Sequence, residues 1–423
     1  MHNRFADPPI SERSAPGATC PPLSLKRQTE AKERKLKLAA RVSRLKAEGA
    51  YEMLARAQAL EAQGREIIHL EIGQPDFDTV PSAALAGIRA ITTGLTRYNP
   101  PPGIPELRAA VATEISRTRG VEVGPENVVI VPGGKPGIFF PMLALVEPGD
   151  EVIYPDPGFP TYESVTHFLG AVPRPVPLLE ENDFSFDMTA FEAALSERTR
   201  LIILNSPSNP TGSVIPRRDL ERIAEAAIAH DAWVLSDEIY SRMVYDGEHV
   251  SIISLPGMLE RTVLLDGFSK AYAMTGWRLG YGVMPVEVAE AMGPLLTHSV
   301  SCTATFTQYA GLAALTGPQD VVDKMVAQFR RRRDVIVEGL NAIPGITCHK
   351  PQGAFYAFPN VKSFGKTSEE MAVYLLEKAG VAVLPGTAFG RHGEGYLRLS
   401  YANSLENLER ALERMREALR KLG

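Results

Sequence analysis

Short apolar runs alternate with helical segments from about residue 125 onward, and this alternation limits the fold more than any other feature of the chain. Between the runs lie stretches with apolar residues at i, i+3 and i+4, such as Leu220–Ala229. Strands that alternate with helices predict an α/β fold with a mostly parallel central sheet covered by helices. The runs expected to form buried strands are Val128–Val131, Glu151–Tyr154, Leu201–Leu204, Trp233–Leu235 and Val263–Leu265.

A different pattern follows this region. The helical run Val321–Leu340 separates the alternating segments from a C-terminal stretch in which strands and one amphipathic helix are expected. These elements are the strands Gly353–Phe358, Ala382–Pro385 and Tyr396–Ala402, and the helix Ser404–Leu422. Because 423 residues exceed what one hydrophobic core usually serves, the chain is expected to form two structural domains.

The domain boundaries follow from this order of elements. We predict a large domain over residues 91–315 and a small α+β domain built from an N-terminal arm, 38–90, and the C-terminal segment, 316–423. Residues 1–37 show little periodicity and are predicted to form a disordered leader, followed by a short helix near residues 30–47. No apolar stretch follows the basic residues of this leader, so a secretory signal is not expected.

Charge and cysteine content argue against several classes of protein. The net charge of −5 gives no attraction for nucleic acid or for an anionic membrane surface. Cys20, Cys302 and Cys348 lie far apart and form no disulfide framework, which favours a reducing, cytoplasmic compartment. The longest apolar stretch, Gly137–Val146, is shorter than the roughly 20 residues of a membrane helix. The eight histidines show no metal-ligand spacing, so no metal site is expected.

Polar and glycine-rich residues follow the ends of the predicted strands. The carboxyl ends of parallel strands meet at one edge of a sheet, where ligands bind in folds of this class. We therefore expect these segments to converge on one site. They are Gly133–Lys135, Pro157–Phe159, Asn205–Gly212, Asp237–Glu238 and Gly267–Lys270.

Two of these segments suit an anion and a nucleophile. Gly134 and Lys135 offer backbone N–H groups before Pro136, which suits the first turn of a helix, although a simple turn is the alternative. Lys270 at a buried strand end can lose its proton by desolvation and attack an aldehyde. Arg278 supplies a fixed fork for phosphate, and its apolar neighbours predict partial burial of both cations. A structural salt bridge is the alternative for this pair.

The remaining candidates are polar or aromatic residues at predicted strand ends or turns. Asp237 follows a buried strand, so its carboxylate needs a cation such as a protonated ring nitrogen, with Tyr240 nearby; a helix N-cap is the alternative. Asn209 can donate to a phenolate oxygen, although a turn residue is the alternative. Phe159 can cover a ring, although a core aromatic is the alternative. Arg398 interrupts an apolar strand, which suits a substrate carboxylate or a structural acidic partner.

Together these motifs resemble the fold-type I, class I/II pyridoxal-phosphate-dependent aminotransferases, in particular their aspartate aminotransferase-like branch. The resemblance covers about residues 40–423. The matching segments are Gly73–Phe77, Tyr98 with Gly103 and Leu107–Arg108, Gly133–Lys135, Asn205–Pro207, Asn209–Gly212, Ser236–Tyr240, Phe268–Lys270, Met274–Arg278, Gly353–Tyr356 and Arg398.

The resemblance implies a role for each matching residue. Lys270 is expected to be catalytic, linked to the cofactor until substrate releases it, and the large domain is expected to bind pyridoxal phosphate. The resemblance assigns cofactor binding to Tyr98, Gly134, Lys135, Phe159, Asn209, Asp237, Tyr240, Ser269, Lys270 and Arg278. It assigns substrate binding to Gly73, Asn209 and Arg398. Tyr98 is expected to reach the neighbouring subunit's site, which implies a homodimer with shared active sites.

The implied reaction is a ping-pong transfer of an amino group between an L-amino acid and a 2-oxo acid, with aspartate- and 2-oxoglutarate-like substrates as the default. Phe159 stands where relatives often have Trp or Tyr, and Gly267 stands where many have Ser, which leaves Ser269 as the expected hydroxyl. A lyase or synthase of the same fold would keep the same cofactor residues. A transcription regulator built on this domain is a further alternative, but the basic leader is short for a DNA-binding module.

Overall fold

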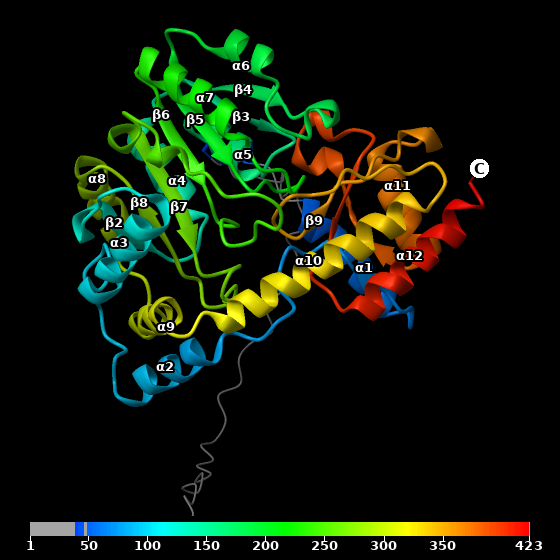
Figure 1. Cartoon of the computed structure of the whole chain (residues 1–423), viewed down its shortest axis with the longest axis horizontal. Helices are drawn as coiled ribbons and strands as arrows, with labels where there is room; N and C mark the ends of the chain where they lie inside the picture. The colour runs from blue at the N-terminus through cyan, green and yellow to red at the C-terminus, as the bar shows by residue number, and fades with distance from the viewer. Residues whose placement is uncertain (1–38, 46–48, 423) are drawn as a thin grey trace, which may run out of the picture. The chain divides into compact units, whose positions relative to one another are not determined.

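Seven strands form the central sheet in the computed structural model, which describes residues 39–45 and 49–422. Their order is β2-β8-β7-β6-β5-β3-β4, and all pairings are parallel except those of β8 with β2 and β7. The mostly parallel sheet is therefore confirmed (Figure 1). The strands are β2 (Val128–Val131), β3 (Glu151–Asp156), β4 (Val172–Pro177), β5 (Thr199–Asn205), β6 (Trp233–Asp237), β7 (Thr262–Gly267) and β8 (Gly280–Val283).

Two strands of this sheet were not predicted, because each contains residues that are uncommon in strands. β4 contains Pro173, Pro175 and Pro177, which cannot donate to a ladder, and it is tolerated because it lies at the sheet edge. β8 contains Gly280 and Gly282, and glycine weakens a strand unless a neighbour needs the space. Both strands depend on their position in the sheet, which local propensity does not reveal.

Helices cover both faces of the sheet because its strands are apolar on both faces. Val129 and Val131 pack with α4 (Pro136–Leu145), α5 (Thr161–Leu169) and α8 (Val286–Thr297) on one face. Val128 and Ile130 point to the other face, with α3 (Pro105–Arg119) and α9 (Thr305–Thr316), as the period of two along a strand requires. Further along this second face lie α6 (Met188–Ala194) and α7 (Arg217–Ala229).

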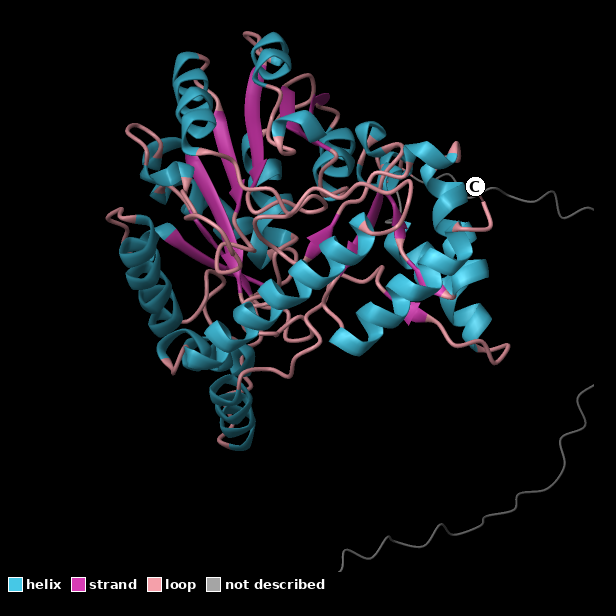
Figure 2. Cartoon of the chain, turned by 45° about the vertical axis from the view of Figure 1, so that its right-hand side comes forward, coloured by secondary structure: helices cyan, strands magenta, loops and turns pink. Residues whose placement is uncertain are grey.

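The C-terminal segment and residues 49–69 build two small sheets and the helices around them (Figure 2). Their apolar side chains belong to one core cluster. One sheet has the order β11-β12-β9 and is antiparallel, and the other pairs β1 with β10 in parallel. The strands are β1 (Ile68–His69), β9 (Tyr356–Ala357), β10 (Val381–Ala382), β11 (Leu384–Pro385) and β12 (Leu397–Ser400). They are shorter than the sequence predicted. The packing helices are α1 (Gly49–Glu61), α10 (Asp320–Asn341), α11 (Ser368–Tyr374) and α12 (Leu405–Leu419).

Residues from Ala40 onward form one compact unit. Within it, α2 (Pro81–Thr92) packs against α9, and the division at residues 90 and 315 stays a prediction. The expected leader, residues 1–37, lies outside the described part of the chain, as does most of the expected helix at 30–47. Across residues 39–45 and 49–422, no helix is long and apolar enough to cross a membrane, and no cluster of three or more His, Cys, Asp or Glu side chains could hold a metal.

Candidate active site

Lys270 lies in the turn after β7 with its amine directed at the C-terminal segment. Its Nζ donates to the Gly73 carbonyl oxygen at 2.5 Å and lies 5.8 Å and 5.6 Å from the ring centres of Tyr240 and Phe355. Burial lowers the pKa of Lys270 to about 8, and the charges of nearby arginines add to this effect. Lys270 forms no ion pair with any described residue, so the salt-bridge alternative is wrong for this lysine. A neutral amine, the form that attacks an aldehyde, is therefore accessible near neutral pH.

Asp237 ends β6 and is buried. Its carboxylate accepts a hydrogen bond from the Tyr162 hydroxyl at 2.7 Å and one from the backbone N–H of Ile239 at 3.3 Å. Burial raises the pKa of Asp237 to about 6. The next helix in the described chain is the 3-10 helix Ile252–Ser254, so Asp237 caps no helix. Because Asp237 has no ion pair among the described residues, it suits a ligand that carries a positive charge.

An anion cradle lies between the end of β2 and the start of α4. Gly133 has a φ of 90°, and a Cβ there would collide with the Arg278 guanidinium. A Cβ at Gly280 would lie 3.0 Å from the Gly133 carbonyl carbon, and one at Gly267 would lie 2.9 Å from the Gly280 Cα. These three glycines, the glycine seam, bring the ends of β2, β7 and β8 into close contact. Arg278 thus lies beside the first residues of a helix, where an anion is stabilised.

Two further predicted residues lie near this cradle, and one expectation about it is wrong. Lys135 immediately precedes α4, and Ser269 is buried beside Lys270. Arg278 is exposed rather than partly buried, and its Nη1 donates to the Thr275 carbonyl oxygen at 2.9 Å. Its φ is 53°, a left-handed backbone conformation that is uncommon for a residue other than glycine.

Arg398 lies on β12, in the C-terminal segment, and is buried. Its guanidinium donates to the backbone oxygen of Glu71 and, at 3.3 Å, to the Asn209 side chain. It also stacks on the rings of Tyr356 and Phe389, at 4.6 Å and 5.0 Å from their centres. The contact with Asn209 joins β12 to the loop after β5, so Arg398 meets the residues at the edge of the large sheet.

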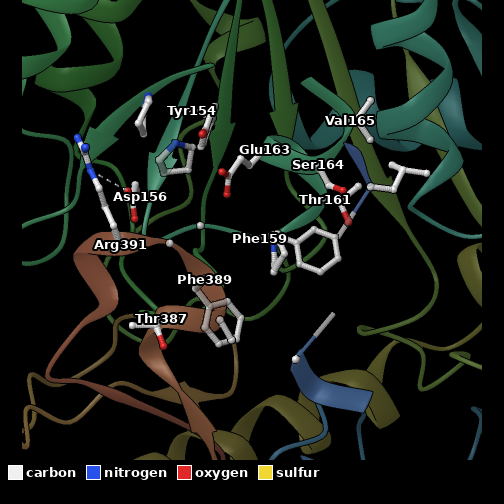
Figure 3. Close-up of a pocket in the computed structure, with 18 of the residues that line it drawn as sticks. Tyr154, Asp156, Phe159, Thr161, Glu163, Ser164, Val165, Thr387, Phe389 and Arg391 are labelled. Carbon is white, nitrogen blue, oxygen red and sulfur yellow. Dashed lines mark ion pairs between the residues drawn. The ribbon is translucent and has the colours of Figure 1, made fainter. Parts of the chain in front are cut away.

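A pocket of about 940 Å³ opens beside these residues. Lys135 lines it from the sheet edge and Met53 from α1. Phe159 and, from the C-terminal segment, Phe389 each contribute a ring (Figure 3). In this view Phe159 and Phe389 face the same space. Carboxylates and cations line it together with many apolar atoms, so its walls suit a small amphiphilic molecule.

The model of the aminotransferase class I and II family matches residues 65–415. The chain belongs to this family. It is 41% identical over 360 residues to an aspartate aminotransferase of Pyrococcus abyssi, an alignment that spans 84% of this chain and 92% of that one. It is 42% identical over 364 residues to aromatic-amino-acid aminotransferase 2 of Thermococcus litoralis, across 85% and 93% of the two chains.

The solved structures agree with this assignment. The aspartate aminotransferase of Thermus thermophilus, determined with maleate, superposes with a TM-score of 0.87 at 40% identity, covering 90% of this chain and 99% of that one. The fold type predicted from the sequence is thereby confirmed. This protein is an aminotransferase that uses pyridoxal phosphate and acts on amino acids and 2-oxo acids. The relatives give no support to the lyase or synthase alternative.

The residues of this aminotransferase fit pyridoxal phosphate. The neutral amine of Lys270 suits its aldehyde, and the ion-pair-free carboxylate of Asp237 suits its protonated ring nitrogen. The open space at Gly134, next to the residue that the Arg278 guanidinium contacts, suits its phosphate. The structure therefore brings together Gly73, Gly134, Lys135, Phe159, Asn209, Asp237, Tyr240, Ser269, Lys270, Arg278 and Arg398.

Tyr98 is the predicted residue that does not join the others within one chain. It follows α2 and its side chain is 89% exposed. Two residues of the aminotransferase site had no predicted role. Tyr356 lies where a Cβ at Gly73 would collide with its hydroxyl, and that hydroxyl is 2.7 Å from the Tyr240 hydroxyl. Tyr162 bonds Asp237 and packs against Phe159, three residues earlier, at 5.8 Å between ring centres.

Proposed function

We propose that Lys270 carries the cofactor of this aminotransferase and transfers the substrate proton during a ping-pong reaction. The position of its amine is the observation that supports this proposal most strongly. That amine faces the Gly73 carbonyl, lies between two aromatic rings and has a pKa lowered by burial. Bound pyridoxal phosphate supplies an electron-accepting ring that makes the substrate Cα–H bond acidic. Lys270, once released by the incoming amino group, takes the proton from that Cα as a general base.

The residues around Lys270 orient the cofactor in this proposal. Asp237 holds the proton on the ring nitrogen, and Tyr162 fixes the carboxylate from behind. Tyr240 and Asn209 bind the phenolic oxygen, while Phe159 covers one face of the ring. The phosphate is held by Gly134, Lys135, Ser269, Arg278 and the Tyr98 of a second subunit.

Arg398 binds the substrate α-carboxylate in this proposal, with Gly73 and Asn209 beside it. Two guanidinium nitrogens can hold both carboxylate oxygens, so the Cα–H bond is fixed relative to the Lys270 amine. We propose aspartate- and 2-oxoglutarate-like substrates, because relatives such as that of Pyrococcus abyssi are named aspartate aminotransferases. The aromatic enzyme among the relatives makes an aromatic amino acid the second donor to test.

We further propose a cytoplasmic homodimer. Leu85, Ile88 and Ile91 lie on one face of α2 and are 68%, 59% and 52% exposed, and Tyr98, which follows this helix in the sequence, is 89% exposed. An apolar helix face of this kind is typical of a subunit interface. Cys302 and Cys348 are free thiols, which suits a reducing compartment. Sedimentation at several protein concentrations tests the dimer, and a monomer at every concentration would contradict it.

Borohydride reduction of the protein with pyridoxal phosphate tests the central proposal. Reduction should fix the cofactor to Lys270, and peptide mass mapping should find the adduct there and not at Lys135. A donor screen against 2-oxoglutarate then identifies the amino acid that gives the largest kcat/KM. An adduct on another lysine would overturn the assignment of Lys270. Formation of 2-oxo acid without any need for an acceptor would instead favour a lyase.

A further inference from the structure

A loop of the C-terminal segment, residues 386–393, lies against the end of β3 at the edge of the pocket (Figure 3). The loop forms two 3-10 helices, Gly386–Phe389 and Arg391–Gly393. β3 ends at Asp156, and only 5% of this side chain is exposed. Asp156 and its partner His392 are 236 positions apart in the sequence, so only the folded chain brings them together.

The Asp156 carboxylate holds the second of these 3-10 helices. Its Oδ1 accepts a hydrogen bond from the backbone N–H of His392 at 3.2 Å, and its Oδ2 lies 2.9 Å from His392 Nδ1. The same Oδ2 lies 3.9 Å from Arg391 Nε, the ion pair drawn in Figure 3. Gly390 has a φ of 134°, and a Cβ there would collide with the carboxylate. The loop therefore approaches Asp156 as closely as a glycine allows.

A backbone hydrogen bond completes this contact. The N–H of Gly158 donates to the Phe389 carbonyl oxygen at 2.7 Å. Within the described chain, no residue outside 386–396 other than Asp156 and Gly158 forms a hydrogen bond with residues 387–392. We call these contacts of Asp156 and Gly158 the β3 joint. The β3 joint thus fixes where Phe389 lies relative to the large sheet.

Phe389 connects the β3 joint to the candidate substrate site. The guanidinium carbon of Arg398 lies 5.0 Å from the Phe389 ring centre and 4.6 Å from that of Tyr356. Phe159, in the segment after β3, faces the same space as Phe389 (Figure 3). A cation gains from an aromatic ring only while the ring stays over it. The β3 joint therefore sets the position of an Arg398 stacking partner relative to the wall that holds the cofactor.

We propose that Asp156 is a positioning residue for substrate binding in this aminotransferase. Through the β3 joint it holds Phe389 against Arg398, so that the guanidinium keeps the orientation in which it binds the substrate α-carboxylate. This inference rests on the proposed role of Arg398. Asp156 acts through Phe389 and not on the reacting atoms. The stacking is the same before and during proton transfer, so its loss weakens substrate binding more than it slows the reaction.

The test measures steady-state kinetics and cofactor affinity for Asp156→Ala and the unchanged protein, both as full chains. The donor is the amino acid that gives the largest kcat/KM with 2-oxoglutarate. We expect Asp156→Ala to raise the KM of this donor about tenfold and to lower kcat less than about threefold. The dissociation constant of pyridoxal phosphate, measured by titration of the cofactor-free chain, should change less than about twofold, because the β3 joint acts on the substrate wall.

Two further variants disturb the β3 joint without changing Asp156. Gly390→Ala places a methyl group against the carboxylate and should also raise KM about tenfold. His392→Ala removes one partner of the carboxylate and should raise KM about threefold. The double variant Asp156→Ala/His392→Ala should be no worse than Asp156→Ala alone, because both changes remove the same contact. The two single variants keep the inference testable if Asp156→Ala fails to fold.

Asp150→Ala is the matched control. Asp150 precedes β3 at the other end of the strand and accepts a hydrogen bond from the backbone N–H of Glu147 at 2.8 Å. It is not among the described residues that line the pocket. Its KM and its cofactor affinity should equal those of the unchanged protein.

The outcomes separate the inference from the proposed function. An unchanged KM in Asp156→Ala or in Gly390→Ala would overturn the role of the β3 joint. A loss of cofactor affinity as large as the rise in KM would do the same, because it would indicate a general loss of structure. Effects of Asp156→Ala and His392→Ala that multiply in the double variant would show that the two residues act separately. If Arg398→Lys leaves KM unchanged, the proposed role of Arg398 is wrong instead.

Discussion

Two groups of ionisable side chains lie at the ends of β6 and β7, and they differ in whether they have charged partners within the chain. In one group, Glu238 and Asp266 each lie within hydrogen-bond distance of Arg119. In the candidate cofactor site, Asp237 and Lys270 have no ion pair with any described residue. Asp237 and Glu238 are neighbours in the sequence, yet the pKa of one is raised to about 6 and that of the other is lowered to about 2.

This contrast shows how many cationic partners a buried carboxylate needs: Glu238 has both Arg119 and His249 beside it, whereas burial raises the pKa of Asp266, which pairs with Arg119 alone, to about 6. Both residues are buried, and burial alone would raise both pKa values. The pKa of Glu238 is lowered in the folded chain, so its ionised form favours folding at neutral pH. Asp237 has no cationic partner within the chain. Its buried charge therefore lowers the stability of the cofactor-free protein, and a cationic group of the cofactor would remove this unfavourable effect when it binds.

The largest effect on transamination should come from a substitution of Lys270, in the candidate cofactor site. Lys270→Ala removes both the covalent attachment and the general base, and we expect single-turnover transamination to fall by at least about 10⁴-fold. Pyridoxal phosphate should still bind, without the absorbance of the covalent form. Lys324→Ala, an exposed lysine paired with Asp320 on α10, is the control and should keep full activity. Retained turnover in Lys270→Ala would contradict the assignment.

The next test compares the two neighbouring carboxylates directly. Asp237→Asn should lower kcat/KM about 10³-fold, because the ring nitrogen loses its anionic partner. The same change should not destabilise the cofactor-free chain. A carboxyl with a raised pKa reduces stability above that pKa, so neutralising it at pH 8 adds on the order of 1–3 kcal/mol. Urea unfolding and kinetics measure the two effects, and a lower urea midpoint would argue against this account of Asp237.

Glu238→Gln should give the opposite pattern. It leaves the Arg119 charge buried beside one remaining carboxylate, Asp266, and breaking a buried pair costs about 3–5 kcal/mol. We expect the urea midpoint to fall sharply while the folded fraction keeps cofactor affinity within a few fold. If Glu238→Gln were as stable as the unchanged protein, the distinction between the two groups would be wrong.

A smaller effect concerns the pH dependence of cofactor uptake. The pKa of Lys270 is lowered to about 8, and the neutral amine attacks the aldehyde. The rate of covalent attachment should therefore rise about tenfold per pH unit up to pH 8 and level off above it. Stopped-flow absorbance after mixing the cofactor-free protein with excess pyridoxal phosphate measures this rate. A profile that continues to rise to pH 10 would show an ordinary, unburied lysine.

The smallest effect is expected at Tyr162. Tyr162→Phe removes one hydrogen bond to Asp237 and leaves the ring packing against Phe159. A single bond of this kind is worth about 0.5–1.5 kcal/mol, so cofactor affinity at pH 7 should fall about three- to tenfold. Tyr154→Phe, a tyrosine of β3 that lines the pocket, is the comparison and should change affinity less. Equal losses in both variants would remove Tyr162 from the site.

The sequence predicted well which residues lie at the carboxyl edge of the sheet, because many of the candidate site residues lie at strand ends. Asp237, Asn209 and Lys270 each follow a strand that is readable from its apolar run, and parallel strands place their carboxyl ends together. Arg398 was found for a different reason, namely that a charge in an apolar strand needs a partner. These inferences use only local pattern and one rule of topology.

The residues that were missed depend on contacts between distant parts of the chain. Arg119 pairs with Glu238 across 119 positions, and Tyr356 meets Tyr240 across 116, so no spacing pattern reveals either pair. Tyr162 left a weak signal at most, because Phe159 precedes α5 and only the folded structure shows the two rings in contact, at 5.8 Å between their centres. The exposure of Arg278 was not predicted either, because its apolar neighbours in the sequence indicated partial burial.

The glycine seam has a consequence for redesigning the specificity of this enzyme. A Cβ would lie 2.9 Å from the Gly280 Cα at Gly267 and 3.0 Å from the Gly133 carbonyl carbon at Gly280, and Gly133 has a φ of 90°, so most clones from saturation mutagenesis at these positions should be impaired. The far wall of the pocket, residues 385–391, carries no such restriction at Thr387 and Ala388. Variant libraries confined to these two positions of that wall can therefore be screened for new amino donors while the cofactor-binding residues stay unchanged.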